Sequence, residues 1–132
     1  MRYLLDTNIV SDLVRTPQGR VTARVRQVGE KNVCTSIIVS AGLRYGAAKK
    51  GSALLAAQLE AVLSALEIFP FEAPADVIYG QLRARLEGGG QPIGGNDLLI
   101  AAQALALGFT LVTDNDRELA RIPELALENW RT

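Results

Sequence analysis

Three groups of acidic residues occupy matching settings in the sequence. Asp6 directly follows the apolar run 3–5, and the acids within 114–118 directly follow the apolar run 110–113. Asp97 precedes the apolar run 98–107, where the first turn of a helix favours an ionised carboxylate by about 0.3–1 kcal/mol. Clustered carboxylates repel one another, and a divalent cation with oxygen ligands is the simplest species that stabilises them. The pattern therefore predicts a metal-binding acidic site.

The chain contains no histidine. This absence excludes Ser-His-Asp and Cys-His catalysis, a histidine general base and the usual zinc sites. Hydrolytic chemistry in this chain must therefore use carboxylates, together with a hard divalent cation that activates water.

Short apolar runs that read as strands alternate with helical patterns along the whole chain. These strands are predicted at 3–5, 32–36, 67–71, 110–113 and 125–128. The alternation, without hairpin signals, indicates a mainly parallel sheet of about five strands in a single three-layer α/β/α domain that spans residues 1–132. Parallel strands end at one edge of the sheet, so the acids that follow them are expected to meet there.

Helices are predicted between these strands. Thr7 or Asn8 is expected to cap the first helix, and Val21, Val25 and Val28 give the second helix one apolar stripe. The first helix is predicted at 9–14, and the helices after the second are predicted at 38–50, 52–66, 74–86 and 98–107. The helices 38–50 and 52–66 form an αα-hairpin around Gly51, which is a plausible surface for a dimer or another partner. The helix 98–107 is apolar on almost every side and is expected to be buried.

The composition predicts a cytoplasmic protein. Lys plus Arg and Asp plus Glu each number 14, so attraction to nucleic acid has to come from local basic patches. Cys34 lies in an apolar run and is expected to be a reduced core residue. The longest apolar stretch, 98–112, is shorter than the roughly 20 residues that cross a bilayer. The N-terminus lacks the charged, apolar and small-residue segments that follow one another in a signal peptide.

Several motifs together resemble the PIN-domain ribonucleases, and more narrowly the VapC toxins of bacterial toxin–antitoxin pairs. The motifs are LLDTN at 4–8, IGGNDLLIAA at 93–102, LVTDN at 111–115, LRYGAAK at 43–49 and LALENW at 125–130. The resemblance covers essentially the whole chain. It implies an endoribonuclease that uses Mg²⁺ or Mn²⁺, acts on structured RNA such as tRNA or rRNA and is inhibited by a cognate VapB-like antitoxin.

The same resemblance implies a homodimer or a toxin–antitoxin hetero-oligomer, which contacts operator DNA only through the antitoxin. By position, Asp6 and Asp97 match two metal-binding acids of the family. Asn115 matches the place of a further acid found in many PIN domains, and Glu118 matches a VapC-like acidic position. Asp114 and Asp116 are expected, at most, to support the metal site.

Four basic residues are candidates for positioning the RNA backbone, although each also reads as an ordinary exposed charge. They are Arg15, Arg44, Lys49 and Arg117.

Gly42 stands where the family has a glutamate. Glycine inside a helix costs about 1 kcal/mol relative to alanine, so it is an unfavourable residue at this position of the predicted helix. One interpretation is that Gly42 allows close packing of helices. The other is that an acid has been lost, which leaves an impaired enzyme or a toxin-like protein that binds antitoxin or RNA without cutting.

A haloacid-dehalogenase-type phosphatase is a further alternative, because it also begins with an aspartate at a strand end. That chemistry normally needs a second aspartate two residues later, where this chain has Asn8, and a lysine near the last acids, which is absent. The metal-dependent ribonuclease therefore remains the favoured function.

Overall fold

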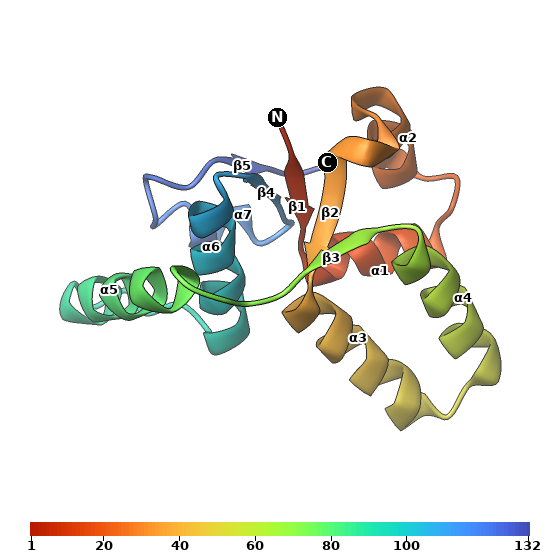
Figure 1. Ribbon diagram of the computed structural model, residues 1–132, viewed down its shortest axis with the longest axis horizontal. Coiled ribbons are helices and arrows are strands. Elements are labelled where there is room, and N and C mark those ends of the chain that lie inside the picture. Colours follow the sequence, from red (N-terminus) through yellow and green to blue (C-terminus); the bar gives the residue numbers. More distant parts are fainter.

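The computed structural model describes residues 1–132, and its five strands form one parallel sheet in the order β3-β2-β1-β4-β5 (Figure 1). This arrangement confirms the predicted parallel sheet of about five strands. The strands are β1 (Tyr3–Leu5), β2 (Val33–Ser36), β3 (Glu67–Phe69), β4 (Thr110–Val112) and β5 (Leu127–Glu128).

Four strands are shorter than the sequence predicts, β2 and β4 by one residue each and β3 and β5 by two residues each. In β3, Phe69 pairs with Ser36, the last residue of β2, so Pro70 and Phe71 have no strand to join. In β5, only Leu127 and Glu128 pair with β4.

Seven helices and one 3₁₀ turn connect the strands. They are α1 (Thr7–Arg15), α2 (Arg20–Val28), the turn η1 (Glu30–Asn32), α3 (Ile37–Lys50), α4 (Ala53–Ser64), α5 (Ala75–Gly88), α6 (Gly95–Leu107) and α7 (Asp116–Leu119). The chain moves from β1 to β2 to β3 in one direction, and then from β3 past β1 to β4 and β5 in the other. Right-handed crossovers therefore place α1–α4 on one face of the sheet and α5–α7 on the opposite face, in agreement with Figure 1.

The chain reverses direction between β1 and β4, whose carboxyl ends lie side by side. The two strands pair directly, from Tyr3 opposite Thr110 to Leu5 opposite Val112. Their outgoing connections lead to opposite faces of the sheet. Open α/β sheets place their ligands at such a switch point. Asp6 follows β1 at this position.

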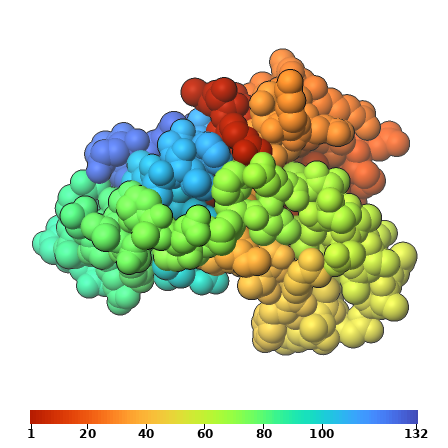
Figure 2. All heavy atoms as spheres, viewed as in Figure 1, coloured from red at the N-terminus to blue at the C-terminus, as the bar shows by residue number.

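The predicted αα-hairpin is confirmed. The side chain of Ser36 caps α3 and that of Ser52 caps α4. Gly51 joins the helices in the left-handed conformation, with φ of 66°, which glycine adopts without strain. Figure 2 shows the tip of the hairpin, in yellow, projecting from the body of the molecule.

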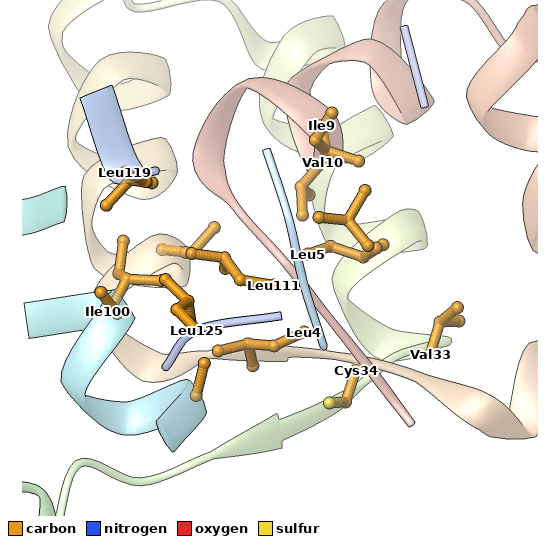
Figure 3. Close-up of a cluster of buried hydrophobic side chains, with 14 of the residues drawn as sticks. Leu4, Leu5, Ile9, Val10, Val33, Cys34, Ile100, Leu111, Leu119 and Leu125 are labelled. Carbon is orange, nitrogen blue, oxygen red and sulfur yellow. The ribbon is translucent and has the colours of Figure 1, made fainter. Parts of the chain in front are cut away.

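The hydrophobic core lies against both faces of the sheet (Figure 3). Leu4, Leu5 and Leu111 are completely buried, and Cys34 is a buried free thiol whose pKa burial raises to about 12. The central part of helix α6, from Leu98 to Ala104, is buried except for the half-buried Leu99, as its composition predicts. The structure contains no helix that is long and apolar enough to cross a membrane.

Candidate functional site

Asp6 is both the end of β1 and the cap of α1. Its side chain is only 5% exposed, and its Oδ1 accepts a hydrogen bond of 2.7 Å from the backbone N–H of Thr7. Its Oδ2 accepts a second bond, of 2.8 Å, from the hydroxyl of Thr113. The prediction that Thr7 or Asn8 caps α1 is wrong, because the carboxylate of Asp6 occupies that position. Both oxygens of Asp6 are thereby fixed in orientation.

Asp97 lies in the first turn of α6 and is joined to Asp6 through two residues. The side-chain nitrogen of Asn115 donates to Oδ2 of Asp97 at 2.8 Å, and the backbone N–H of Asn115 donates to the Thr113 hydroxyl at 3.0 Å. Thr113 in turn donates to Asp6. A continuous hydrogen-bonded path therefore links the two aspartates, which the sequence separates by most of the chain.

Burial and neighbouring negative charges disfavour the ionised form of both aspartates. Burial raises the pKa of Asp6, and the negative charges of Asp97 and Asp114 raise it further, although the bonds from Thr113 and Thr7 act in the opposite direction. Burial also raises the pKa of Asp97, and the charges of Glu118 and Asp114 add to this effect. The predicted stabilisation of Asp97 by the helix end is therefore outweighed. This edge of the sheet holds excess negative charge that a cation would relieve.

The donor chemistry of the site fits a hard divalent cation. Asp6 and Asp97 offer carboxylate oxygens, the ligands that Mg²⁺ and Mn²⁺ prefer. No three acidic, histidine or cysteine side chains converge tightly enough to complete a metal centre by themselves. The structure thus presents two carboxylates and lacks a third.

The residues after β4 divide into two sets. Asn115 and Glu118 face Asp97: Asn115 presents its amide nitrogen, and Glu118 accepts from Asn115 at 3.5 Å and from the backbone N–H of Gly94 at 3.3 Å. Asp116 begins α7 and accepts a bond of 3.3 Å from Asn129, outside this group.

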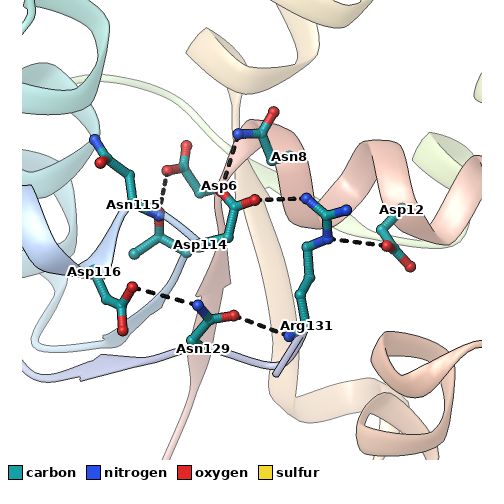
Figure 4. Close-up of polar contacts among 9 residues, drawn as sticks. Asp6, Asn8, Asp12, Asp114, Asn115, Asp116, Asn129 and Arg131 are labelled. Atoms are coloured by element: carbon teal, nitrogen blue, oxygen red, sulfur yellow. Dashed lines mark hydrogen bonds and ion pairs between the residues drawn. The ribbon is translucent and has the colours of Figure 1, made fainter.

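Asp114 lies between the two sets. Its Oδ1 accepts a bond of 3.0 Å from Asn8, and its Oδ2 pairs with Arg131 at 2.5 Å (Figure 4). Asp114 is also close enough for its charge to raise the pKa values of Asp6 and Asp97. It therefore belongs to the electrostatic environment of the site.

Gly42 lies in open space on α3. A Cβ atom added there would meet no atom within 4 Å, so the interpretation of Gly42 as a contact for close helix packing is wrong. The residue borders a cavity of about 190 Å³, which Ser11 and Arg15 of α1 and Lys50 of α3 also line. A longer side chain at position 42 has room to extend.

The four basic candidates occupy different environments. Arg44 is bound within the hairpin, donating to Ser40 at 3.2 Å and to Glu60 at 2.6 Å. Arg15, Lys49 and Arg117 are exposed and form no ion pair. Arg15 lines the cavity beside Gly42.

Sequence reasoning missed Thr113, Asn8 and Arg131. The position of Thr113 at the end of a buried strand, directly before Asp114, was a usable signal, because a fully buried hydroxyl needs a partner. Nothing local marked Arg131, since its partners are far away in sequence.

Thr113→Val is expected to weaken Mn²⁺ binding about tenfold, because supporting hydrogen bonds contribute at this level to metal sites. The variant removes a donor that lowers the pKa of Asp6, so protons should compete with the metal at higher pH. Calorimetric titrations at pH 6 and pH 8 measure this, with Thr113→Ser as the control that keeps the hydroxyl. Identical binding by the valine variant at both pH values would contradict the assigned role.

Comparison with known proteins identifies the family. Residues 3–125 match the PIN domain. The chain is 42% identical to ribonuclease VapC2 of Rickettsia felis and 32% identical to the tRNA(fMet)-specific endonuclease VapC of Salmonella typhimurium, in each case over 98% of both chains. The crystal structure of VapBC2 from Rickettsia felis, bound to a promoter DNA fragment, superposes with a TM-score of 0.91 at 42% identity, covering 98% of this chain and 99% of that one. The chain belongs to the VapC family of PIN-domain ribonucleases.

Proposed function

We propose that this protein is a metal-dependent endoribonuclease toxin that cleaves structured RNA, with activity reduced by the absence of a carboxylate at position 42. The observation that carries the proposal is the convergence of Asp6 and Asp97 at the carboxyl edge of the sheet, where Thr113 and Asn115 join them. The family supplies the reaction class, hydrolysis of RNA phosphodiesters. The name of the Salmonella typhimurium relative favours tRNA as the substrate class.

Asp6 and Asp97 are the residues that would hold Mg²⁺ or Mn²⁺. When bound, the cation activates water and neutralises the charge that develops on the phosphate during hydrolysis. Thr113 and the Thr7 N–H fix the orientation of Asp6, while Asn115 fixes that of Asp97. Glu118 holds the backbone of Gly94, directly before α6, and so positions the helix that carries Asp97.

The RNA backbone is proposed to contact exposed cations of this chain. Arg15, Lys49 and Arg117 are exposed and free of ion pairs, so their charges are available to phosphates. Arg44 is the weakest candidate, because Glu60 already accepts from its guanidinium.

We also propose a cognate VapB-like antitoxin as partner, and a homodimer or toxin–antitoxin hetero-oligomer as the assembled form. The Rickettsia felis relative was crystallised as VapBC2 with promoter DNA, and operator contact here is assigned to the antitoxin alone. The hairpin offers apolar surface, since Tyr45 and Leu54 are 66% and 70% exposed. We place the single domain of residues 1–132 in the cytoplasm, where its RNA substrate and antitoxin are found.

Incubation with total RNA in Mn²⁺ is expected to give slow, discrete cleavage that EDTA abolishes. Asp97→Asn should lower the rate by at least about 100-fold, because it removes one of two carboxylates from a metal site. Sequencing of the cut ends identifies the RNA and the cleavage position. Cleavage that persists in EDTA would contradict the metal-dependent proposal.

A second candidate function is a toxin-like protein that binds antitoxin or RNA without cleaving it. The absence of a third converging acid, together with Gly42, favours this alternative. Metal titration separates the two: Mn²⁺ binding with RNA cleavage supports the enzyme, whereas antitoxin binding without cleavage supports the binding protein.

A further inference from the structure

Arg131 joins two acids that flank the site. Its Nε lies 3.2 Å from Asp12 on α1, and its guanidinium also pairs with Asp114 at 2.5 Å (Figure 4). The backbone N–H of Arg131 donates to the side chain of Asn129 at 3.0 Å, and Asn129 donates to Asp116 at 3.3 Å. These ion pairs and hydrogen bonds hold the segment 129–132 beside the carboxyl edge of the sheet.

The ion pairs of Arg131 are more shielded than ordinary surface pairs. The side chains of Asp12 and Asp114 are 17% and 22% exposed, and that of Arg131 is 38% exposed. Partial burial reduces screening by water and salt. None of the other ion pairs includes an acid from 114–118, so Arg131 is the residue that forms ion pairs with this group of acids.

Arg131 affects the proposed metal site through its ion pair with Asp114. The negative charge of Asp114 disfavours ionisation of both Asp6 and Asp97. Asn8 and Arg131 each hold one of its two oxygens. The carboxylate of Asp114 is therefore near the two aspartates but committed to other partners.

We propose that Arg131 is a positioning residue, an internal counter-cation that holds Asp114 toward Asp12 and so withholds a third carboxylate from a divalent cation at Asp6 and Asp97. This inference rests on the proposed metal site. It explains how a chain with glycine at position 42 keeps an acid beside the site without presenting that acid as a ligand.

The proposal predicts effects of opposite sign when Arg131 is removed. Without metal, the repulsion among Asp114, Asp6 and Asp97 loses its compensation, so the folded protein becomes less stable. With metal, Asp114 is released and the local potential is more negative, so the cation binds more tightly. A purely structural residue would instead lower both stability and metal affinity when it is lost.

Calorimetric titration of the full chain with Mn²⁺ tests this. Arg131→Gln is expected to bind Mn²⁺ about threefold to tenfold more tightly than the unaltered chain, as the loss of a nearby positive charge implies, and to melt at lower temperature in EDTA. Arg85→Gln is the matched control, since it breaks the Arg85–Glu124 pair outside the 114–118 group and should leave the Mn²⁺ affinity unchanged. Arg131→Met, which keeps the aliphatic stem, serves if the glutamine variant folds poorly.

A double-mutant cycle assigns the effect to Asp114. Asp114→Asn should change the affinity less than threefold in the unaltered chain, but should remove most of the gain in the Arg131→Gln background, because the released Asp114 carboxylate supplies most of it. If the unaltered chain binds Mn²⁺ and Arg131→Gln binds equally or more weakly, the inference is overturned while the proposed function stands. If neither chain binds Mn²⁺, the inference and the metal-dependent function are both overturned.

Discussion

Gly42→Glu is expected to increase the rate of RNA cleavage in Mn²⁺ by at least about tenfold, the scale at which metal-site groups affect activity. The gain follows from the proposed function, in which position 42 lacks the carboxylate that the family has there. The structure accepts the change, because a Cβ at position 42 meets no atom within 4 Å and a cavity of about 190 Å³ lies beside it. Single-turnover cleavage of a tRNA substrate measures the effect.

Two control variants separate the carboxylate from the backbone effect. Gly42→Ala and Gly42→Gln should both stabilise α3 by about 0.5–1 kcal/mol, because any residue other than glycine restricts the unfolded chain. Neither adds a negative charge, so neither should raise the cleavage rate. Equal activity in the glutamate and glutamine variants, or no gain in either, would mean that a missing acid is not what limits this protein.

Asp6→Asn is expected to lower the rate of RNA cleavage by at least about 100-fold and to raise the melting temperature of the metal-free protein by a few degrees. Burial raises the pKa of Asp6 above its ordinary value of 3.8, so its ionised form is less favourable in the folded than in the unfolded protein. Asparagine keeps an oxygen that can cap α1 at the Thr7 N–H. The neutral side chain therefore removes a destabilising charge and keeps the cap, although its amide nitrogen cannot accept the bond that Thr113 donates to Oδ2 of Asp6.

The sign of the pH dependence follows from the same shift. Between pH 3.8 and the raised pKa of folded Asp6, the folded state binds more protons than the unfolded state, so the contribution of Asp6 to stability falls as pH rises through this window. Thermal unfolding in EDTA across pH 4–8 should show this decline in the unaltered chain and a weaker one in Asp6→Asn. Asp76→Asn, at an exposed acid in the first turn of α5, should show neither the stabilisation nor the loss of cleavage. Lower stability of Asp6→Asn at neutral pH would contradict the assigned electrostatics.

The sequence predicts those features that depend on local pattern. The buried runs define the strands, and because parallel strands end at one edge of a sheet, the pattern alone places Asp6 near Asp97. Features decided by distant partners are not predictable in this way. The length of β3, for example, depends on where β2 ends.

The same limit applies to individual residues of the site. The surroundings of Gly42 depend on how α3 packs, so sequence alone does not decide between close contact and open space. Arg131 reaches Asp12 and Asp114 only because the chain after β5 returns along α1, which no periodicity reveals. Likewise, the path of the backbone decides which of Asp6, Thr7 and Asn8 caps α1.

Mn²⁺ titration of the unaltered chain, Asp6→Asn and Asp97→Asn tests most directly whether the two aspartates share one cation. We expect the unaltered chain to bind one Mn²⁺ and each variant to lose at least about tenfold in affinity, because each removes a ligand from the same site. Unchanged Mn²⁺ binding in either variant would contradict the shared metal site.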